Sequence, residues 1–145
     1  MSIKDLHSNI RTKNVITPAA IGANATKTGI VIDRQGYGGV EFIAAYGSVT
    51  TTGTIVTLVV KEGDVTGTLT SVADADLLGT EALASLLAAT PRAAGTTKEV
   101  TKRVGYKGIK RYVSVDAVQT GVTSVGCVSV TALLHSPALG PQTNP

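Results

Sequence analysis

The chain has 145 residues, 43% of them hydrophobic and 16% charged, and a formal net charge of +3. This composition is typical of one globular domain with a sizeable core, and it excludes a disordered chain. Cys127, the only cysteine, excludes an internal disulfide, and no apolar run is long enough for a membrane-spanning helix.

The first 13 residues mix charge with three apolar side chains, Ile3, Leu6 and Ile10. Their spacing would place them on one face of a helical turn or two. Two interpretations stay open: a frayed terminus, or an arm that docks on a neighbouring subunit. Because the first five residues are already charged and no apolar segment follows, we expect no signal peptide and folding in a cytosol. Residues 14–21 contain Pro18, which indicates an edge strand or an extended arm.

From residue 26 onward, strand patterns recur about every dozen residues, as in an all-β sandwich or barrel. Strands are predicted at 28–33, 40–46, 54–62, 69–73 and 100–105, and the glycines of 35–39 predict a turn. Alternation predicts two buried faces, formed by Val40, Phe42, Ala44 and Tyr46 in one strand and by Val56, Leu58 and Val60 in the next.

Residues 74–90 break this pattern, since leucine and alanine dominate there and favour a helix. We expect a short helix capped by Thr80, with Leu83, Leu86 and Leu87 as its apolar stripe, ending before Pro91. Asp74 and Asp76 lie where N-capping would explain at least one of them. They lack the Asp-x-Asp-x-Asp-Gly pattern of a calcium loop.

Two β-branched runs, 109–118 and 122–134, are joined by Gln119-Thr120-Gly121 and predict a hairpin that forms the spine of the domain. We therefore predict an all-β fold, an antiparallel β-sandwich or jelly-roll-like barrel with one short helix. The predicted parts are an N-terminal arm (1–13), a β-sandwich domain (14–136) and an extended C-terminal tail (137–145).

No catalytic constellation is present, so we expect no enzyme, no cofactor and no metal site. His7 and His135 are the only histidines, and zinc needs three or four ligands in a tight cluster. Cys127 lies in a valine-rich run and is interpreted as a small buried residue. The glycines of 36–39 precede another strand, whereas a dinucleotide-binding loop must precede a helix.

Residues 98–111 form a basic segment, with six basic residues against Glu99. Its net charge is +5, and the rest of the chain sums to −2. The cations could follow nucleic-acid phosphates, form a solvated strand edge, or meet an acidic surface of a partner protein. Nucleic acid is disfavoured because only Tyr106 and Tyr112 are near enough to stack on bases. A protein partner is favoured.

The order of several segments resembles a family of small tailed-bacteriophage head proteins, the decoration or cement proteins. The likeness spans about residues 14–137 and rests on 18–20 (PAA), 29–33 (GIVID), 39–42 (GVEF), 72–79 (VADADLLG) and 103–113 (RVGYKGIKRYV). The chain departs from the family in 83–89, which reads as additional helical sequence, and in the tail after Pro137.

The resemblance implies a β-sandwich or jelly-roll-like module that binds the outside of an assembled capsid and cements neighbouring major capsid subunits. Its partners would be the major capsid protein and further copies of itself, as a trimer, with no membrane contact. It would be made in the bacterial cytoplasm and end on the capsid surface of the virion. The predicted interface comprises Ile3, Leu6, Ile10, Arg11, Lys102, Arg103, Lys107, Lys110 and Arg111.

Two alternatives remain. One is a head–tail connector or tail protein that forms a ring in the same virion. The other is a β-sandwich module that binds the host surface.

Overall fold

The computed structural model describes residues 5–22, 24–47, 55–86, 100–120 and 126–141. Three short helices are η1 (His7–Asn9), η2 (Asp74–Asp76) and α1 (Glu81–Ala84). The strands are β1 (Ile10–Ile21), β2 (Thr26–Lys27), β3 (Ile32–Asp33), β4 (Tyr37–Tyr46), β5 (Ile55–Gly63), β6 (Thr70–Ser71), β7 (Leu77–Leu78), β8 (Val100–Tyr106), β9 (Tyr112–Thr120) and β10 (Gly126–Pro137).

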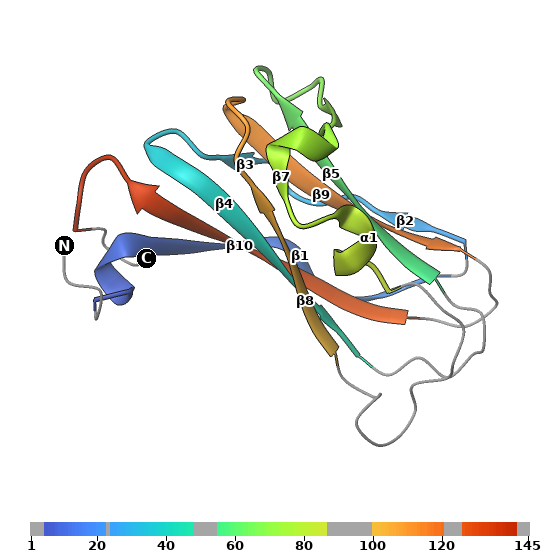
Figure 1. Ribbon diagram of the computed structural model, residues 1–145. Coiled ribbons are helices and arrows are strands. Elements are labelled where there is room, and N and C mark those ends of the chain that lie inside the picture. Colours follow the sequence, from blue (N-terminus) through green and yellow to red (C-terminus); the bar gives the residue numbers. More distant parts are fainter. Residues whose placement is uncertain (1–4, 23, 48–54, 87–99, 121–125, 142–145) are drawn as a thin grey trace.

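These strands form two antiparallel sheets, which pack as a β-sandwich (Figure 1). The first sheet has the order β1-β10-β4-β8-β7, and the second has the order β2-β9-β5-β6, with β3 also paired to β9. The all-β prediction is confirmed, and so is one short helix, since α1 is the only α-helix among the described residues. Its N-cap is also confirmed, because the Thr80 hydroxyl accepts a hydrogen bond from Leu83 N at 3.1 Å.

The predicted spine hairpin is wrong, although both of its strands exist. β9 pairs with β5 in the second sheet, whereas β10 lies between β1 and β4 in the first sheet. β-Propensity identifies a strand but carries no information about which sheet it joins. β9 and β10 therefore face each other across the core instead of sharing a ladder. Residues 121–125, which hold the end of the predicted turn, lie outside the described residues.

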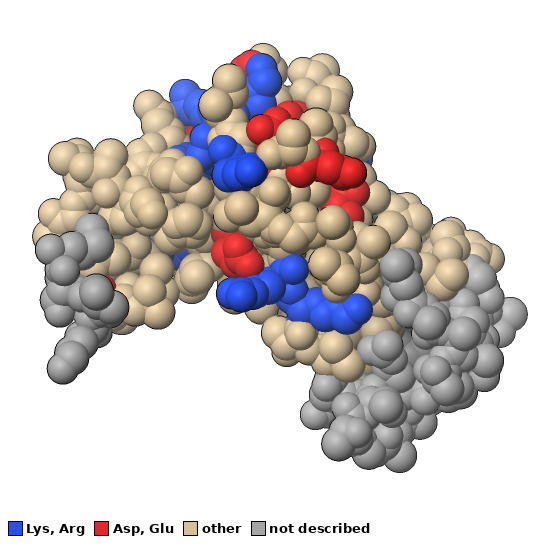
Figure 2. All heavy atoms as spheres, in the orientation of Figure 1, with Lys and Arg blue, Asp and Glu red and all other residues tan. Residues whose placement is uncertain are grey.

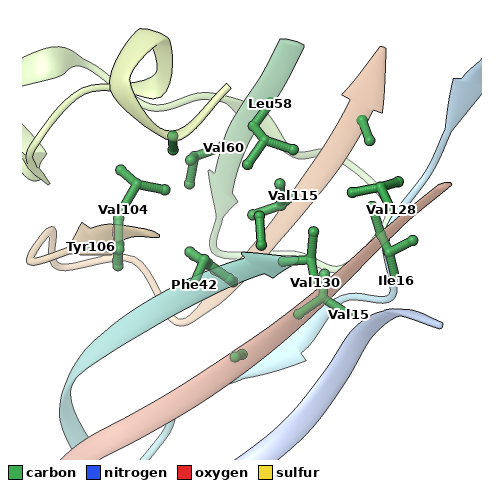
Figure 3. Close-up of a cluster of buried hydrophobic side chains, with 14 of the residues drawn as sticks. Val15, Ile16, Phe42, Leu58, Val60, Val104, Tyr106, Val115, Val128 and Val130 are labelled. Atoms are coloured by element: carbon green, nitrogen blue, oxygen red, sulfur yellow. The ribbon is translucent and has the colours of Figure 1, made fainter. Parts of the chain in front are cut away.

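The core fills the space between the sheets (Figure 3). Phe42 and Val130 point from the first sheet toward Leu58, Val60 and Val115 of the second, and all five are at most 1% exposed. Every residue of the two predicted buried faces, in β4 and in β5, is buried as expected. Burying a side chain of this size contributes about 1.5–3 kcal/mol, which makes this layer the main source of stability.

β1 is an edge strand, as Pro18 indicated. Its register with β10 shifts between Asn14 and Ile16 and again between Ile16 and Ala19. Proline has no backbone N–H, so it is tolerated where the ladder is interrupted. The first shift is a β-bulge that lets two successive residues, Val15 and Ile16, both be buried.

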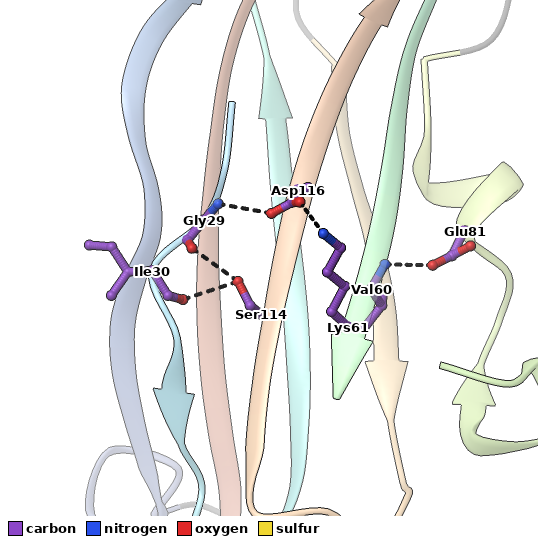
Figure 4. Close-up of polar contacts among 7 residues, drawn as sticks. All are labelled: Gly29, Ile30, Val60, Lys61, Glu81, Ser114 and Asp116. Atoms are coloured by element: carbon purple, nitrogen blue, oxygen red, sulfur yellow. Dashed lines mark hydrogen bonds and ion pairs between the residues drawn. The ribbon is translucent and has the colours of Figure 1, made fainter. Parts of the chain in front are cut away.

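The outer edge of β5 is closed by the segment around α1. The backbones of Val56 and Leu86 each donate a hydrogen bond to the other, at 3.0 and 2.8 Å. Two side chains accept from the next backbone amides on this edge: Ser85 Oγ from Leu58 N at 2.8 Å, and Glu81 Oε1 from Val60 N at 2.5 Å (Figure 4). Burial raises the pKa of the Glu81 carboxyl. Backbone groups that an edge strand would leave open thus have partners inside the same chain.

The predicted strand over 28–33 is divided, and its middle crosses from one sheet to the other. Ile30 N donates to Val15 O of β1 at 2.8 Å, while Gly29 N donates to Asp116 Oδ1 of β9 at 3.2 Å. Asp116 also forms a 2.6 Å ion pair with Lys61 (Figure 4). A β-carbon on Gly29 would lie 2.1 Å from Val115 O, so the segment packs this closely only because residue 29 is glycine.

Three local predictions are wrong. Leu83 is 69% exposed instead of forming a buried stripe, because α1 is only four residues long and the extended chain after it buries Leu86. Leu87 lies outside the described residues. Cys127 is exposed, since residues alternate along β10 and the next residue, Val128, is the one that faces the core. No side chain caps η2, so Asp74 and Asp76 are not N-caps.

Candidate partner-binding surface

Arg34 joins two turns at one end of the sandwich. It follows β3, and its guanidinium donates to Lys110 O and Gly108 O, each at 2.6 Å, and more weakly to Tyr37 O at 3.3 Å. The same group lies over the Tyr106 ring, 5.3 Å from its centre. A planar guanidinium can hold several acceptors at once, so Arg34 fixes residues 107–111, here called the 107–111 loop, against the turn before β4.

The Tyr106 side chain packs against the 107–111 loop and holds it by a hydrogen bond. Its hydroxyl donates to Glu62 and accepts from Lys110 N at 3.1 Å. Burial and the hydrogen bond to Glu62 raise the pKa of the Tyr106 phenol, which keeps it protonated. A β-carbon on Gly108 would clash with this hydroxyl, so the glycine allows the loop to lie flat on the ring.

Ile109 lies in this supported loop and is 90% exposed. Single exposed apolar side chains are common on monomer surfaces, so the exposure of Ile109 gains meaning only from the ordered loop that carries it. Because Arg34 and Tyr106 already order the loop, binding through Ile109 would lose little further conformational entropy. This combination is typical of an interface anchor.

The basic segment is not one continuous surface. Lys102 Nζ donates to Ser85 O at 2.6 Å, and Arg103 lies 3.6 Å from Glu41 on the opposite side of β8. The other described basic residues, Lys107, Lys110 and Arg111, belong to the loop. On the face drawn in Figure 2, basic and acidic side chains lie beside each other, so the positive charge is divided and largely compensated.

Two cations of the loop are held by carboxylates. Lys110 forms a 2.5 Å ion pair with Asp64, and Arg111 forms two hydrogen bonds with Asp33, at 2.7 and 3.1 Å. The hydrogen bond from Arg111 lowers the pKa of the Asp33 carboxyl. Asp64 raises the pKa of Lys110. Lys107 is exposed and forms no ion pair with any described residue.

The arm residues are placed differently from one another. Ile3 lies outside the described residues, and Leu6 is 62% exposed just before η1. Ile10 and Arg11 are the first residues of β1 and are half-buried. The predicted shared helical face is wrong for Leu6 and Ile10, because η1 is three residues long and Ile10 is already extended. An interface role for these residues stays a prediction.

Two adjoining hollows mark this end of the sandwich. One, of about 240 Å³, is lined by Arg34, Gln35, Gly36, Tyr37, Ile109 and Arg111. The other, of about 330 Å³, is lined by Arg11, Lys13, Asp33, Gln35, Tyr37 and Leu134. Because they share Gln35 and Tyr37, we treat them as one region, here called the end surface.

Sequence reasoning found Arg11 and Arg111 of the end surface but missed Arg34, Lys13 and Tyr37. The glycine-rich turn at 35–39 predicted that the chain bends beside Arg34. Nothing in the sequence indicated that this turn lies against both the loop before β9 and the start of β1. Topology brings these segments together.

No three His, Cys, Asp or Glu side chains in the described part of the chain come close enough to hold a metal ion. The described helices include none that is long and apolar enough to cross a membrane.

The fold defines the chain as an antiparallel β-sandwich. No protein-family model and no curated protein matches it. Among solved structures it is similar to the PBSX exported protein XepA, with a TM-score of 0.54 and 14% identity over 92% of this chain. That match covers 40% of the XepA chain, so the present chain spans less than half of that protein. The likeness shows a shared fold.

Weaker likenesses involve proteins of similar length. The SPBc2 prophage-derived protein YomS gives a TM-score of 0.47 at 17% identity, covering 88% of this chain and 94% of that one. A chain of the capsid of Helicobacter pylori bacteriophage KHP30 gives 0.46 at 10% identity, covering 91% and 94%.

Proposed function

We propose that this protein is a structural component of a tailed-phage virion that binds the outside of the capsid and cements neighbouring major capsid subunits. The sequence resemblance to decoration proteins suggests this role, and the observation that carries it is the end surface. There, an ordered loop presents Ile109 at a hollow that Arg34 and Arg111 also line.

The end surface fits a binding role better than a catalytic one. Its hollows are small and open, and its polar groups are mostly fixed in structural hydrogen bonds, as with Arg34. Repeated contacts of moderate strength are sufficient on a capsid, because many copies bind the same lattice and linked sites reinforce one another. In this proposal the protein contributes mechanical stability and no chemistry.

Binding to heads tests the proposal directly. Purified protein would be mixed with phage heads prepared without it, and bound copies counted after sedimentation. Ile109→Asp should reduce occupancy at least about tenfold, because it places a charge where an apolar anchor is needed. Leu83→Asp is the matched control, since Leu83 is also a large exposed apolar residue but belongs to α1 and lines neither hollow. Equal occupancy of both variants would contradict the proposal.

The arm needs a separate test. Because Ile10 and the residues after it belong to β1, a clean truncation removes residues 1–9 and leaves the sheet intact. If the arm clamps a neighbouring subunit, the truncated protein should fold with an unchanged melting temperature and occupy fewer sites on heads. Full occupancy would exclude the arm from the interface.

A second candidate function is a ring-forming connector or tail protein of the same virion. The specific observation in its favour is the outer edge of β1 at Ile10–Asn14, beside which no described strand pairs. An open edge can pair with another copy, as a ring requires. Copy number separates the two functions: hundreds per particle for decoration, and about a dozen for a connector, where one ring follows its own closed symmetry.

A further inference from the structure

β1 begins with two cations on the side that faces the core. In an antiparallel pair, directly opposite residues project to the same face of the sheet. Arg11 is opposite Leu134 and Lys13 is opposite Ala132, and both partners on β10 are fully buried core residues. Arg11 and Lys13 therefore occupy inward positions on a face whose other residues are mainly apolar.

The second sheet supplies part of the opposite wall. From that sheet comes Asp33 of β3, while Gln35 of the following turn and Tyr37, the first residue of β4 in the first sheet, complete the hollow of about 330 Å³. Lys13 and Asp33 line the same hollow, and the positive charge of Lys13 adds to the effect of Arg111 in lowering the pKa of Asp33. However, Asp33 is already engaged by two hydrogen bonds from Arg111, so Arg11 and Lys13 have no dedicated counter-ion among the described residues.

Arg11 also lacks a hydrogen bond that its surroundings require. Its Nε is buried, yet no acceptor within the described residues reaches it. Buried donors are nearly always paired, so an unpaired one indicates either strain or a missing partner. Neither Arg11 nor Lys13 forms an ion pair with any described residue.

From these observations we propose that the hollow is a receptor for a carboxylate, supplied by an Asp or Glu side chain of the partner protein. This inference rests on the proposed function, since it names the chemistry of the partner at the end surface. A carboxylate is planar and carries one charge, and it matches a guanidinium edge with two hydrogen bonds. A hollow of this size admits one side chain, and the apolar wall at Leu134 suits the methylene groups of Glu.

A phosphate group is the competing ligand, and the surroundings disfavour it. Asp33 lines the same hollow and would repel a dianion more strongly than a monoanion. Nucleic acid would also need a continuous row of cations, whereas Lys110 and Arg111 next to the hollow are already paired with carboxylates.

Small anions test the hollow in the isolated protein. We would titrate sodium acetate into the isotopically labelled protein at pH 7 and follow backbone amide NMR signals, with sodium chloride at equal ionic strength as the reference. Acetate should shift the amides of Arg11, Lys13, Gln35 and Tyr37 in a saturable way. Arg11→Met should weaken acetate binding about tenfold, because it keeps the length of the side chain but removes the bidentate donor.

Two further variants keep the test decisive. Lys13→Gln changes an exposed side chain, so it should fold normally and weaken acetate binding even if Arg11→Met does not fold. Arg103→Met is the matched control, since Arg103 is 79% exposed on the outer side of β8, and it should bind acetate like the unchanged protein. Equal acetate binding by all three variants, or saturable shifts with inorganic phosphate but not with acetate, would overturn the inference.

The head-binding assay separates this inference from the proposed function. If both hold, Arg11→Met and Lys13→Gln lose occupancy on heads while Arg103→Met does not. If acetate binds as expected but the unchanged protein never binds heads, the carboxylate receptor stands and the capsid-binding role fails. If heads are bound and acetate is not, the capsid role stands and the receptor is rejected.

Discussion

The outer edge of β5 in the second sheet is covered by other parts of the chain, whereas part of the outer edge of β1 in the first sheet is open. Along β5, the segment around α1 gives partners to Val56, Leu58 and Val60, using a backbone bridge, a serine hydroxyl and a glutamate. Along β1, Ile30 reaches Val15, but no described strand lies beside Ile10–Asn14. The closed edge prevents unwanted pairing, whereas the open one lies where Arg11 and Lys13 line a hollow. Under the proposed function, the open end is where the partner binds.

The closed edge should depend most on Leu86. Leu86→Ala removes a fully buried side chain next to β5 and should lower the free energy of unfolding by about 3 kcal/mol. Leu83→Ala, in the same segment but exposed, should change it by less than about 0.5 kcal/mol. Urea unfolding of both variants measures the difference. Similar losses would mean that the segment does not close the edge.

The covered half of β1 should depend on Gly29. Gly29→Ala would force its β-carbon against Val115 O and Val15 Cγ1, so we expect a loss of about 2 kcal/mol. Gly67→Ala is the control, since nothing lies within 4 Å of the added carbon there, and it should be neutral or slightly stabilising. Thermal unfolding of the two variants checks this, and equal melting temperatures would refute the close packing of residues 28–31.

Hydrogen exchange should distinguish the two edges in the unchanged protein. The amides of Leu58 and Val60 have partners and should exchange slowly. In an antiparallel ladder, alternate residues of Ile10–Asn14 direct their N–H away from β10, and these should exchange at least about tenfold faster. Uniform protection along β1 would show that its edge is covered in solution, for example by another copy.

Glu81, at the closed edge, should make the free energy of unfolding depend on pH. Burial raises its pKa in the folded state above that in the unfolded state. The folded state therefore holds the proton more tightly, and stability should fall as the pH rises from about 4 through the folded pKa. Glu81→Gln retains an acceptor for Val60 N and should remove this decrease. The check is the difference in unfolding free energy between the two proteins from pH 4 to 7, and a constant difference would contradict it.

Asp33, at the open end, should show a smaller effect of opposite sign. Arg111 lowers the pKa of Asp33, so the ion pair stabilises the fold above about pH 4 and is lost as the pH falls through the lowered pKa. Asp33→Asn should be less sensitive to acid than the unchanged protein. Because the pair is partly exposed, the difference should shrink in high salt. A melting temperature with the same acid dependence in both proteins would argue against the pair.

Much of the fold could be predicted from local pattern. Alternation placed the buried faces of β4 and β5 because one side of each strand packs on the core and side chains alternate along a strand. The assignment of β9 and β10 to one hairpin failed, since pairing partners are chosen by contacts between distant segments. Leu83 failed for a related reason: the helix stops before its apolar stripe can form.

The end surface was predictable only in part. The charges of Arg11 and Arg111 stood out in the sequence, whereas the contribution of Arg34 depends on carbonyl oxygens more than 70 residues away. Lys13 and Tyr37 meet because β1 and β4 both flank β10. Contacts of this kind follow from the strand order, and a single sequence gives no direct signal of them.

The position of β10 between β1 and β4 has a consequence for biosynthesis. β1 emerges from the ribosome before the other described strands, yet its partner in the first sheet emerges after all of them. At typical translation rates the delay is on the order of ten seconds, during which β1 has no ladder to join. The first sheet is therefore completed late and through contacts between distant parts of the chain, which slows folding and exposes the nascent strand to chaperones.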